Sequence, residues 1–282
     1  MVVSIRESLG LSSRGVVSLI GAGGKSSLMF SLARELAAEG HTVLSTTTTH
    51  IWVPSKKQSS VCLVEKTAQD LVDRALPLFK KHPHLTAGSR QIPELKKLKG
   101  FDAPVIDAVW KSACIDWIIV EADGARQLSI KASDVHEPVI PSCTTAIVHV
   151  TGLDSLGMPL DEDHVHRAAL FSSNTGLALG QNVDARAVAT SCVLELWKAR
   201  NLALTCPDLL VCLNKADDPS RIADSRAVVD LLKNNRYLFE NTQDRPLFKN
   251  FSHPSDAALP GPSRVVLASL ADPDPIKDVV IL

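Results

Sequence analysis

The sequence has almost no net charge, no long apolar run and no paired cysteines, and each absence excludes a class of protein. Its 282 residues include 30 basic and 31 acidic side chains, which gives a formal net charge of -1. This balance offers no electrostatic reason to expect nucleic acid or an anionic membrane surface as a partner. No segment approaches the roughly 18 uninterrupted apolar residues of a membrane helix. We expect the polar residues 1–15 to be neither a signal peptide nor an anchor.

The six cysteines are scattered, and no two of them form a C-x-x-C pair. Most stand in apolar surroundings typical of a strand or a helix, where cysteine behaves as a small buried hydrophobe. A zinc site built on cysteines is therefore not expected, and a reducing compartment is the simpler interpretation. We expect a cytoplasmic protein.

Hydrophobic patterning predicts an α/β protein with a mainly parallel sheet. A β-branched apolar run at residues 16–20 ends in glycines and is followed by apolar residues at helical spacing and a second strand at 42–45. Such a β-α-β unit implies parallel strands with helices on the faces of the sheet. The alternation continues, and we predict one domain over residues 1–282 with irregular insertions near 80–100 and 151–184. Further strands are predicted at 61–64, 116–121, 145–150, 209–213 and 265–268, and further helices after a Thr67 cap, at 105–110, at 189–197 and at 225–232.

A glycine-rich turn with a lysine lies where the first strand gives way to a helix. Its glycines let backbone N–H groups converge on an anion, and the helix N-terminus adds a favourable dipole. The lysine neutralises phosphate charge and the serine hydroxyl enters a Mg²⁺ shell. The pattern G-x-x-x-x-G-K-[ST] requires its first glycine at position 19, which is Leu19, so this loop departs from the pattern and is expected to be tighter. The segment reads Gly21-Ala22-Gly23-Gly24-Lys25-Ser26-Ser27.

We favour phosphate binding by this turn over the alternative, a glycine turn that merely permits close packing of helix and strand. Lysine and serine stand at the required places in a strand-loop-helix context. The predicted fold is therefore a three-layer, P-loop NTPase-like α/β fold with a mainly parallel sheet.

The strand at 116–121 ends in two carboxylates, Glu121 and Asp123, followed by Gly124. P-loop NTPases need an acid at this place to hold Mg²⁺ or to orient the attacking water. The two acids have matching strand parity, so both would face one side if the strand persists. Either acid is a candidate, and the alternative is an ordinary polar strand exit. Arg126, just beyond, would reach phosphate or be solvated.

A buried strand at 209–213 is followed by the pattern N-K-x-D, formed by Asn214, Lys215 and Asp217. In GTP-binding proteins the aspartate of this pattern accepts hydrogen bonds from N1–H and the 2-amino group of guanine, which adenine cannot supply. The asparagine fixes the loop and the lysine stem covers the ring. The pattern also suits a plain strand-to-helix turn. Because it follows the phosphate loop and the acidic strand end in the expected order, we predict GTP rather than ATP.

Other polar clusters have weaker signals. Thr47, within the threonines at 46–49, would complete a Mg²⁺ shell or sense the γ-phosphate, or would simply extend the strand through β-propensity. An H-x-H pair, His164 and His166, is followed by Arg167, and His136 lies upstream. Two histidines do not make a metal site, and solvated or hydrogen-bonded histidines are the simpler interpretation. If they converge on the phosphate loop, they would form the acceptor side of a reaction.

Several of these segments resemble the YqeC family, whose members are described as accessory factors for selenium-dependent molybdenum hydroxylases. The resemblance implies nucleotide turnover in maturing a labile selenium-containing molybdenum centre, with a hydroxylase or its maturation factors as partner. It extends from about residue 16 to residue 217. The matching blocks are IGAGGKSSLMF at 20–30, LSTTTTHI at 44–51, VEADGAR at 120–126, HEPVIP at 136–141, GLD at 152–154, VHR at 165–167 and LNKAD at 213–217.

Three functions follow from these observations. The first is a Mg²⁺-dependent GTPase in which Lys25 and Ser26 bind phosphate and metal, Glu121 or Asp123 organises water, and the N-K-x-D segment reads guanine. The second is a small-molecule kinase or nucleotidyl transferase that uses the same loop with GTP or ATP. The third is a nucleotide-binding carrier without turnover. A homodimer would suit a maturation factor, although the sequence identifies no interface.

Overall fold

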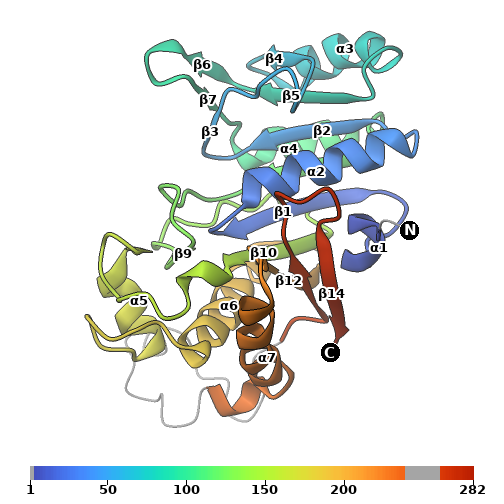
Figure 1. The fold of residues 1–282 in the computed structure, drawn as a ribbon. Helices are drawn as coiled ribbons and strands as arrows, with labels where there is room; N and C mark the ends of the chain where they lie inside the picture. Colours follow the sequence, from blue (N-terminus) through green and yellow to red (C-terminus); the bar gives the residue numbers. More distant parts are fainter. Residues whose placement is uncertain (1–2, 239–260) are drawn as a thin grey trace.

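The computed structural model describes residues 3–238 and 261–282 and shows an α/β protein built on one large sheet (Figure 1). The order of the strands within the described residues is β14-β13-β12-β10-β1-β8-β2-β5-β4. Neighbouring strands pair in parallel, except that β14 runs antiparallel to β13. The sheet strands are β1 Gly15–Gly21, β2 Val43–Thr47, β4 Cys62–Val64, β5 His84–Gly88, β8 Trp117–Glu121, β10 Ala146–Gly152, β12 Asp208–Asn214, β13 Arg264–Ala268 and β14 Ile276–Ile281.

Helices cover both faces of the sheet because alternate strand residues are apolar on both sides. Val17 and Leu19 of β1 pack in one cluster with α2, whereas Ile20 packs on the other face with α6. The Thr67 side chain caps α3, as predicted, by accepting a hydrogen bond from Asp70 N. The helices of the described residues are α1 Ile5–Leu9, α2 Lys25–Ala38, α3 Ala68–Phe79, α4 Ala103–Lys111, α5 Ala168–Thr175, α6 Ala185–Arg200 and α7 Pro219–Lys233.

The strand order reverses at β1. The chain leaves β1 toward β2 on one side and later fills the other side with β10, β12 and β13. In an open α/β sheet, ligands bind outside the carboxyl ends of the strands at such a switch point. The turn after β1 is therefore where the topology favours a ligand.

The predicted insertion near 80–100 contains much of a small antiparallel sheet of β3 His50–Trp52, β7 Lys97–Lys99 and β6 Arg90–Ile92, in that order. Its apolar face, with Ile51 and Leu98 buried, lies against the main core. A second pair, β9 Ile130–Lys131 and β11 Val165–His166, runs parallel near the loops that follow β8 and β10.

The structure confirms an α/β fold with a large, mainly parallel sheet. It also contains elements that the sequence did not predict: strand β5 of the main sheet lies in the segment near 80–100, and helix α5 lies in the segment 151–184, both predicted as irregular insertions. The C-terminal segment returns as the edge strand β14, and the polar N-terminus contains the five-residue helix α1. No helix within the described residues is both long and apolar enough to cross a membrane.

Gly100 lies where the small sheet meets the end of β2. A Cβ atom there would stand 1.7 Å from the carbonyl oxygen of Thr47, which is backbone and cannot move aside. We expect Gly100→Ala to lower the free energy of unfolding by about 1–3 kcal/mol because of this overpacking, measured by urea denaturation. Gly124→Ala is the control, since its Cβ would meet only Glu137 Oε1 at 3.9 Å. Equal losses in both variants would contradict this account.

Candidate functional site

The glycine turn between β1 and α2 is as short as the sequence predicts. β1 ends at Gly21 and α2 begins at Lys25, with Gly24 as N-cap at φ 137°. A Cβ atom on Gly24 would lie 2.2 Å from the side-chain nitrogen of Asn214. Only glycine combines this conformation with so close an approach. The glycine at position 24 thus lets the N-terminus of α2 and the N-K-x-D segment approach closely.

Lys25 is the first residue of α2, and its side chain folds back under the turn. It is 4% exposed, its ammonium lies 2.7 Å from Asp123 Oδ1, and it donates to the carbonyl oxygen of Gly21. Asp123 is fully buried and also accepts from Gly21 N at 2.8 Å. Lys25 and Asp123 therefore stabilise the glycine turn through their contacts with the backbone of Gly21 and with each other.

Glu121 occupies a different place from Asp123. It is the last residue of β8, and its Oε2 accepts a 2.6 Å hydrogen bond from Ser26 Oγ on the first turn of α2. Burial raises the pKa of Glu121, against the opposing charge of Lys25. Since β8 ends at Glu121, strand parity does not extend to Asp123. Of the two acids, Glu121 lines the open cleft.

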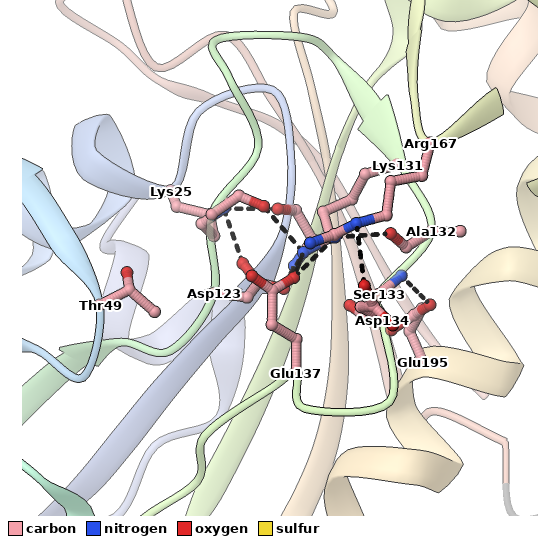
Figure 2. A network of polar contacts seen from close by, with 12 residues as sticks. Lys25, Thr49, Asp123, Lys131, Ala132, Ser133, Asp134, Glu137, Arg167 and Glu195 are labelled. Carbon is pink, nitrogen blue, oxygen red and sulfur yellow. Dashed lines mark hydrogen bonds and ion pairs between the residues drawn. The ribbon is translucent and has the colours of Figure 1, made fainter. Parts of the chain in front are cut away.

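A chain of ion pairs leads from the turn across the site (Figure 2). Asp123 lies 3.1 Å from Lys131, Lys131 lies 2.9 Å from Glu137, and Glu137 lies 2.8 Å from Arg167. Burial opposes ionisation of Asp123 most strongly, yet the charges of Lys25 and Lys131 keep its pKa below the usual value. Burial also disfavours the Glu137 carboxylate, but the contacts with Arg167 and Lys131 lower its pKa to about 2. The side chain of Lys131, in the middle of this series of ion pairs, is fully buried.

The N-K-x-D segment lies directly beside the glycine turn. Asn214 donates to the carbonyl oxygen of Gly23 at 2.7 Å and accepts from Leu270 N at 3.1 Å. The side chain of Lys215 lies 2.7 Å from Asp154. Asp217 accepts from Ser269 Oγ at 2.6 Å and pairs with Arg221 at 3.1 Å. The two loops after β12 and β13 thus form one unit with the glycine turn.

One cleft of about 1340 Å³ joins these parts. Its walls include Ser26 of the glycine turn, Glu121 at the end of β8, and Asp217 of the N-K-x-D segment. The segment that follows Glu121, including Arg126, forms a further wall. Residues separated by nearly two hundred positions therefore share one solvent-accessible space.

The threonines and histidines divide between the cleft and the interior. Thr47 is buried, and its hydroxyl donates to the carbonyl oxygen of Glu121 at 2.7 Å; Thr49 lines the cleft instead. His166 lines the cleft, whereas His164 pairs with Asp161 outside it. Arg167 also lines the cleft, beside His166 in the sequence, whereas His136 is exposed outside the cleft. Within the described residues no group of three histidines, cysteines or acids could hold a metal by itself.

Backbone strain concentrates at the cleft. Six non-glycine residues of the described chain have positive φ, and four of them line this space. Such conformations cost on the order of 1–3 kcal/mol each and cluster at functional sites. The four are Arg126, Gln127, Arg167 and Lys215.

Sequence reasoning missed two groups of residues here. Ser269 and Leu270 complete the loop that positions Asp217 and Asn214, and their only signal was that they follow a predicted strand. Lys131 and Glu137 connect Asp123 to Arg167, and a lysine within a two-residue strand has no sequence signal for burial. Position in a parallel sheet would have indicated the first group, whereas the second depends on tertiary packing.

A family model described as YqeC protein matches residues 17–169, which is more than half of the chain. The chain belongs to the YqeC family. A YqeC relative from Escherichia coli (strain K12), called "Uncharacterized protein YqeC", is 36% identical over 162 residues, which cover 57% of this chain and 61% of that protein. The chain thus aligns with less than two thirds of that relative. The YqeC match contains the glycine turn, Glu121 and Asp123 but ends before Asn214, so the N-K-x-D segment lies outside the matched residues.

Proposed function

We propose that this YqeC protein has a P-loop NTPase-like fold and binds a nucleoside triphosphate with Mg²⁺, GTP in preference to ATP, and hydrolyses it. The observation that supports this most strongly is the single cleft shared by the glycine turn, Glu121 and Asp217. A phosphate-binding turn, an acid for metal and a base-reading loop are the three parts that such a site requires.

At the phosphate end, the backbone N–H groups of the turn and the start of α2 would hold the phosphate oxygens. The Lys25 ammonium, now on Asp123, would turn to the terminal phosphates while Lys131 continues to balance Asp123. Buried Asp123 is then a positioning residue for Lys25.

Ser26 Oγ and Glu121 fit a magnesium ion. They provide a hydroxyl and a carboxylate 2.6 Å apart at the cleft, and Mg²⁺ typically takes few protein oxygens and completes its shell with phosphates and water. The bound ion would neutralise phosphate charge during transfer. Thr49, which lines the cleft next to Glu121, and not buried Thr47, is the threonine placed to contact water or phosphate there.

At the base end, Asp217 would accept from N1–H and the 2-amino group of guanine. Ser269 fixes one carboxylate oxygen, and Arg221 on the other would give way to the base. Asn214 holds the loop against Gly23, so the base and phosphate ends stand at a fixed separation.

Hydrolysis by such a site is expected to be slow alone, because P-loop catalysis depends on positioning and charge stabilisation that a partner completes. We extend the proposal to the role implied by the family resemblance, in which a cytoplasmic client, a selenium-dependent molybdenum hydroxylase or its maturation factor, triggers turnover. A kinase or transferase remains the second candidate, favoured by a cleft larger than the 300–1,000 Å³ typical of one small ligand.

Asp217→Asn tests the base assignment by changing which base is preferred. Asparagine offers one acceptor and one donor, which suits the N1–H and 2-oxo group of xanthine but opposes the 2-amino group of guanine. We expect GTP affinity to fall by about 100-fold, equivalent to about 2.7 kcal/mol, and xanthosine triphosphate to become the better ligand. Equilibrium titration of both nucleotides against both proteins measures the change.

Asp218→Asn is the matched control for this exchange. Asp218 is the next residue, caps α7 by accepting from Ser220 N and Arg221 N, and does not line the cleft. Asparagine is an equally good N-cap, so the base preference should stay with GTP. A preference unchanged in Asp217→Asn, or switched in both variants, would overturn the base assignment.

A further inference from the structure

The small sheet of β3, β7 and β6 has a face that the nucleotide proposal does not use. Residues directly opposite in antiparallel strands point to the same side, and the register places His50 beside Lys99 and Trp52 beside Lys97. Arg90 lies on the far side of Lys99. We call these five residues the basic face: His50, Trp52, Arg90, Lys97 and Lys99.

The basic face is positive, and none of its members is an acid. Within the described part of the chain, Arg90, Lys97 and Lys99 form no ion pair with any carboxylate. Burial first, and then these three cations, lower the pKa of His50. Three unpaired cations on adjacent strands create a potential that attracts an anion.

An aromatic ring stands within this positive surface. Trp52 is 53% exposed, although tryptophan is usually well buried. The Lys97 ammonium lies 5.5 Å from its ring centroid, within the range of a cation–π contact. An exposed ring beside positive charge is the arrangement that binds stacked, negatively charged ring compounds.

Three of the five residues of the basic face line the same cleft as the glycine turn, whereas Arg90 and Lys99 lie outside its lining. His50, Trp52 and Lys97 line that cleft together with Ser26 and Glu121. The opposite face of the small sheet is fixed, because Ile51 and Leu98 are buried in the core. A concave, rigid wall of this kind favours a small molecule over the flat surface of a protein partner.

We propose that the basic face binds a small planar ring compound with a negatively charged group, its ring stacked on Trp52 and its anion held by Lys97 at the cleft. The cleft then holds two ligands, with this compound beside the phosphate loop. The site is built from different residues than the nucleotide site, so either can exist without the other.

Riboflavin 5′-phosphate, a planar anion, is a suitable probe, with riboflavin and inorganic phosphate as matched probes that lack the charge or the ring. We expect the full probe to bind more tightly than either, with a loss of about tenfold or more in Trp52→Ala and a clear loss in Lys97→Gln. Leu95→Ala is the control variant. Leu95 is exposed in the turn between β6 and β7 of the same small sheet, but it belongs neither to the basic face nor to the lining of the cleft. Calorimetry measures each affinity.

A further variant separates this site from the nucleotide site. Lys25→Ala should leave the probe bound, whereas a probe lost in Lys25→Ala and retained in Trp52→Ala sits at the phosphate loop and overturns the proposal. Equal binding of riboflavin and its phosphate, no binding of the probe, or the same loss in Leu95→Ala would overturn it as well. None of these results depends on whether GTP binds.

Discussion

Lys25→Ala should reduce affinity for the triphosphate by at least about 100-fold, about 2.7 kcal/mol. The ammonium is the one lysine charge on the glycine turn, and it lies at the start of α2 where phosphate oxygens would gather. Hydrogen bonds between charged groups in a partly buried site are worth the most. Calorimetric titration of GTP with Mg²⁺ measures the loss.

The variant should still fold, which makes the loss of binding interpretable. In the unaltered chain Asp123 lies 3.1 Å from Lys131 and accepts from the N–H of Gly21 at 2.8 Å, and both partners remain when Lys25 is replaced. Thermal unfolding followed by circular dichroism verifies this. A folded Lys25→Ala protein that binds GTP as tightly as the unaltered chain would show that the turn is only a packing device.

Glu137→Gln should change how stability depends on acid. The pKa of Glu137 falls from 4.5 to about 2 on folding, so its ionised form stabilises the protein fully above about pH 4.5 and loses this effect as the pH falls toward 2. The shift corresponds to on the order of 3 kcal/mol. We expect Glu137→Gln to be less stable by about that amount near neutral pH, with the difference shrinking steadily below about pH 4.5.

Urea denaturation at a series of pH values measures this difference between the two proteins. Glu94→Gln provides the control, because Glu94 is exposed in the turn between β6 and β7. A difference for Glu137→Gln that stays constant with pH would mean that Arg167 and Lys131 do not hold its carboxylate ionised. A difference as small as that of Glu94→Gln would contradict the buried ion-pair chain.

Local patterns predicted the elements that carry the site. Glycines after a β-branched run predicted the turn before Lys25, and the acid at the end of an apolar strand placed Glu121 near Ser26. Because β8, β1, β10 and β12 pair in parallel, the ends of these strands lie at one edge of the sheet. These signals are local because each depends on residues within one turn or strand.

Contacts across the fold could not be predicted in the same way. From the sequence, Asp123 and Glu121 were equal candidates for the metal-binding acid. In the structure β8 ends at Glu121, and buried Asp123 pairs with Lys131 instead of lining the cleft. The edge strand β14 could not be predicted either, because it depends on pairing with β13, which no local pattern indicates. Buried charge networks arise from several loops at once, so a single sequence segment contains little trace of them.

The most direct test of the central claim is calorimetric titration of GTP and ATP, each with Mg²⁺, against the purified protein. The account predicts that GTP binds clearly more tightly than ATP, and that omitting Mg²⁺ weakens GTP binding, because Ser26 and Glu121 would then lack the ion that links them to phosphate. Equal affinity for the two nucleotides would contradict guanine recognition by Asp217, and binding of neither would contradict the phosphate loop itself.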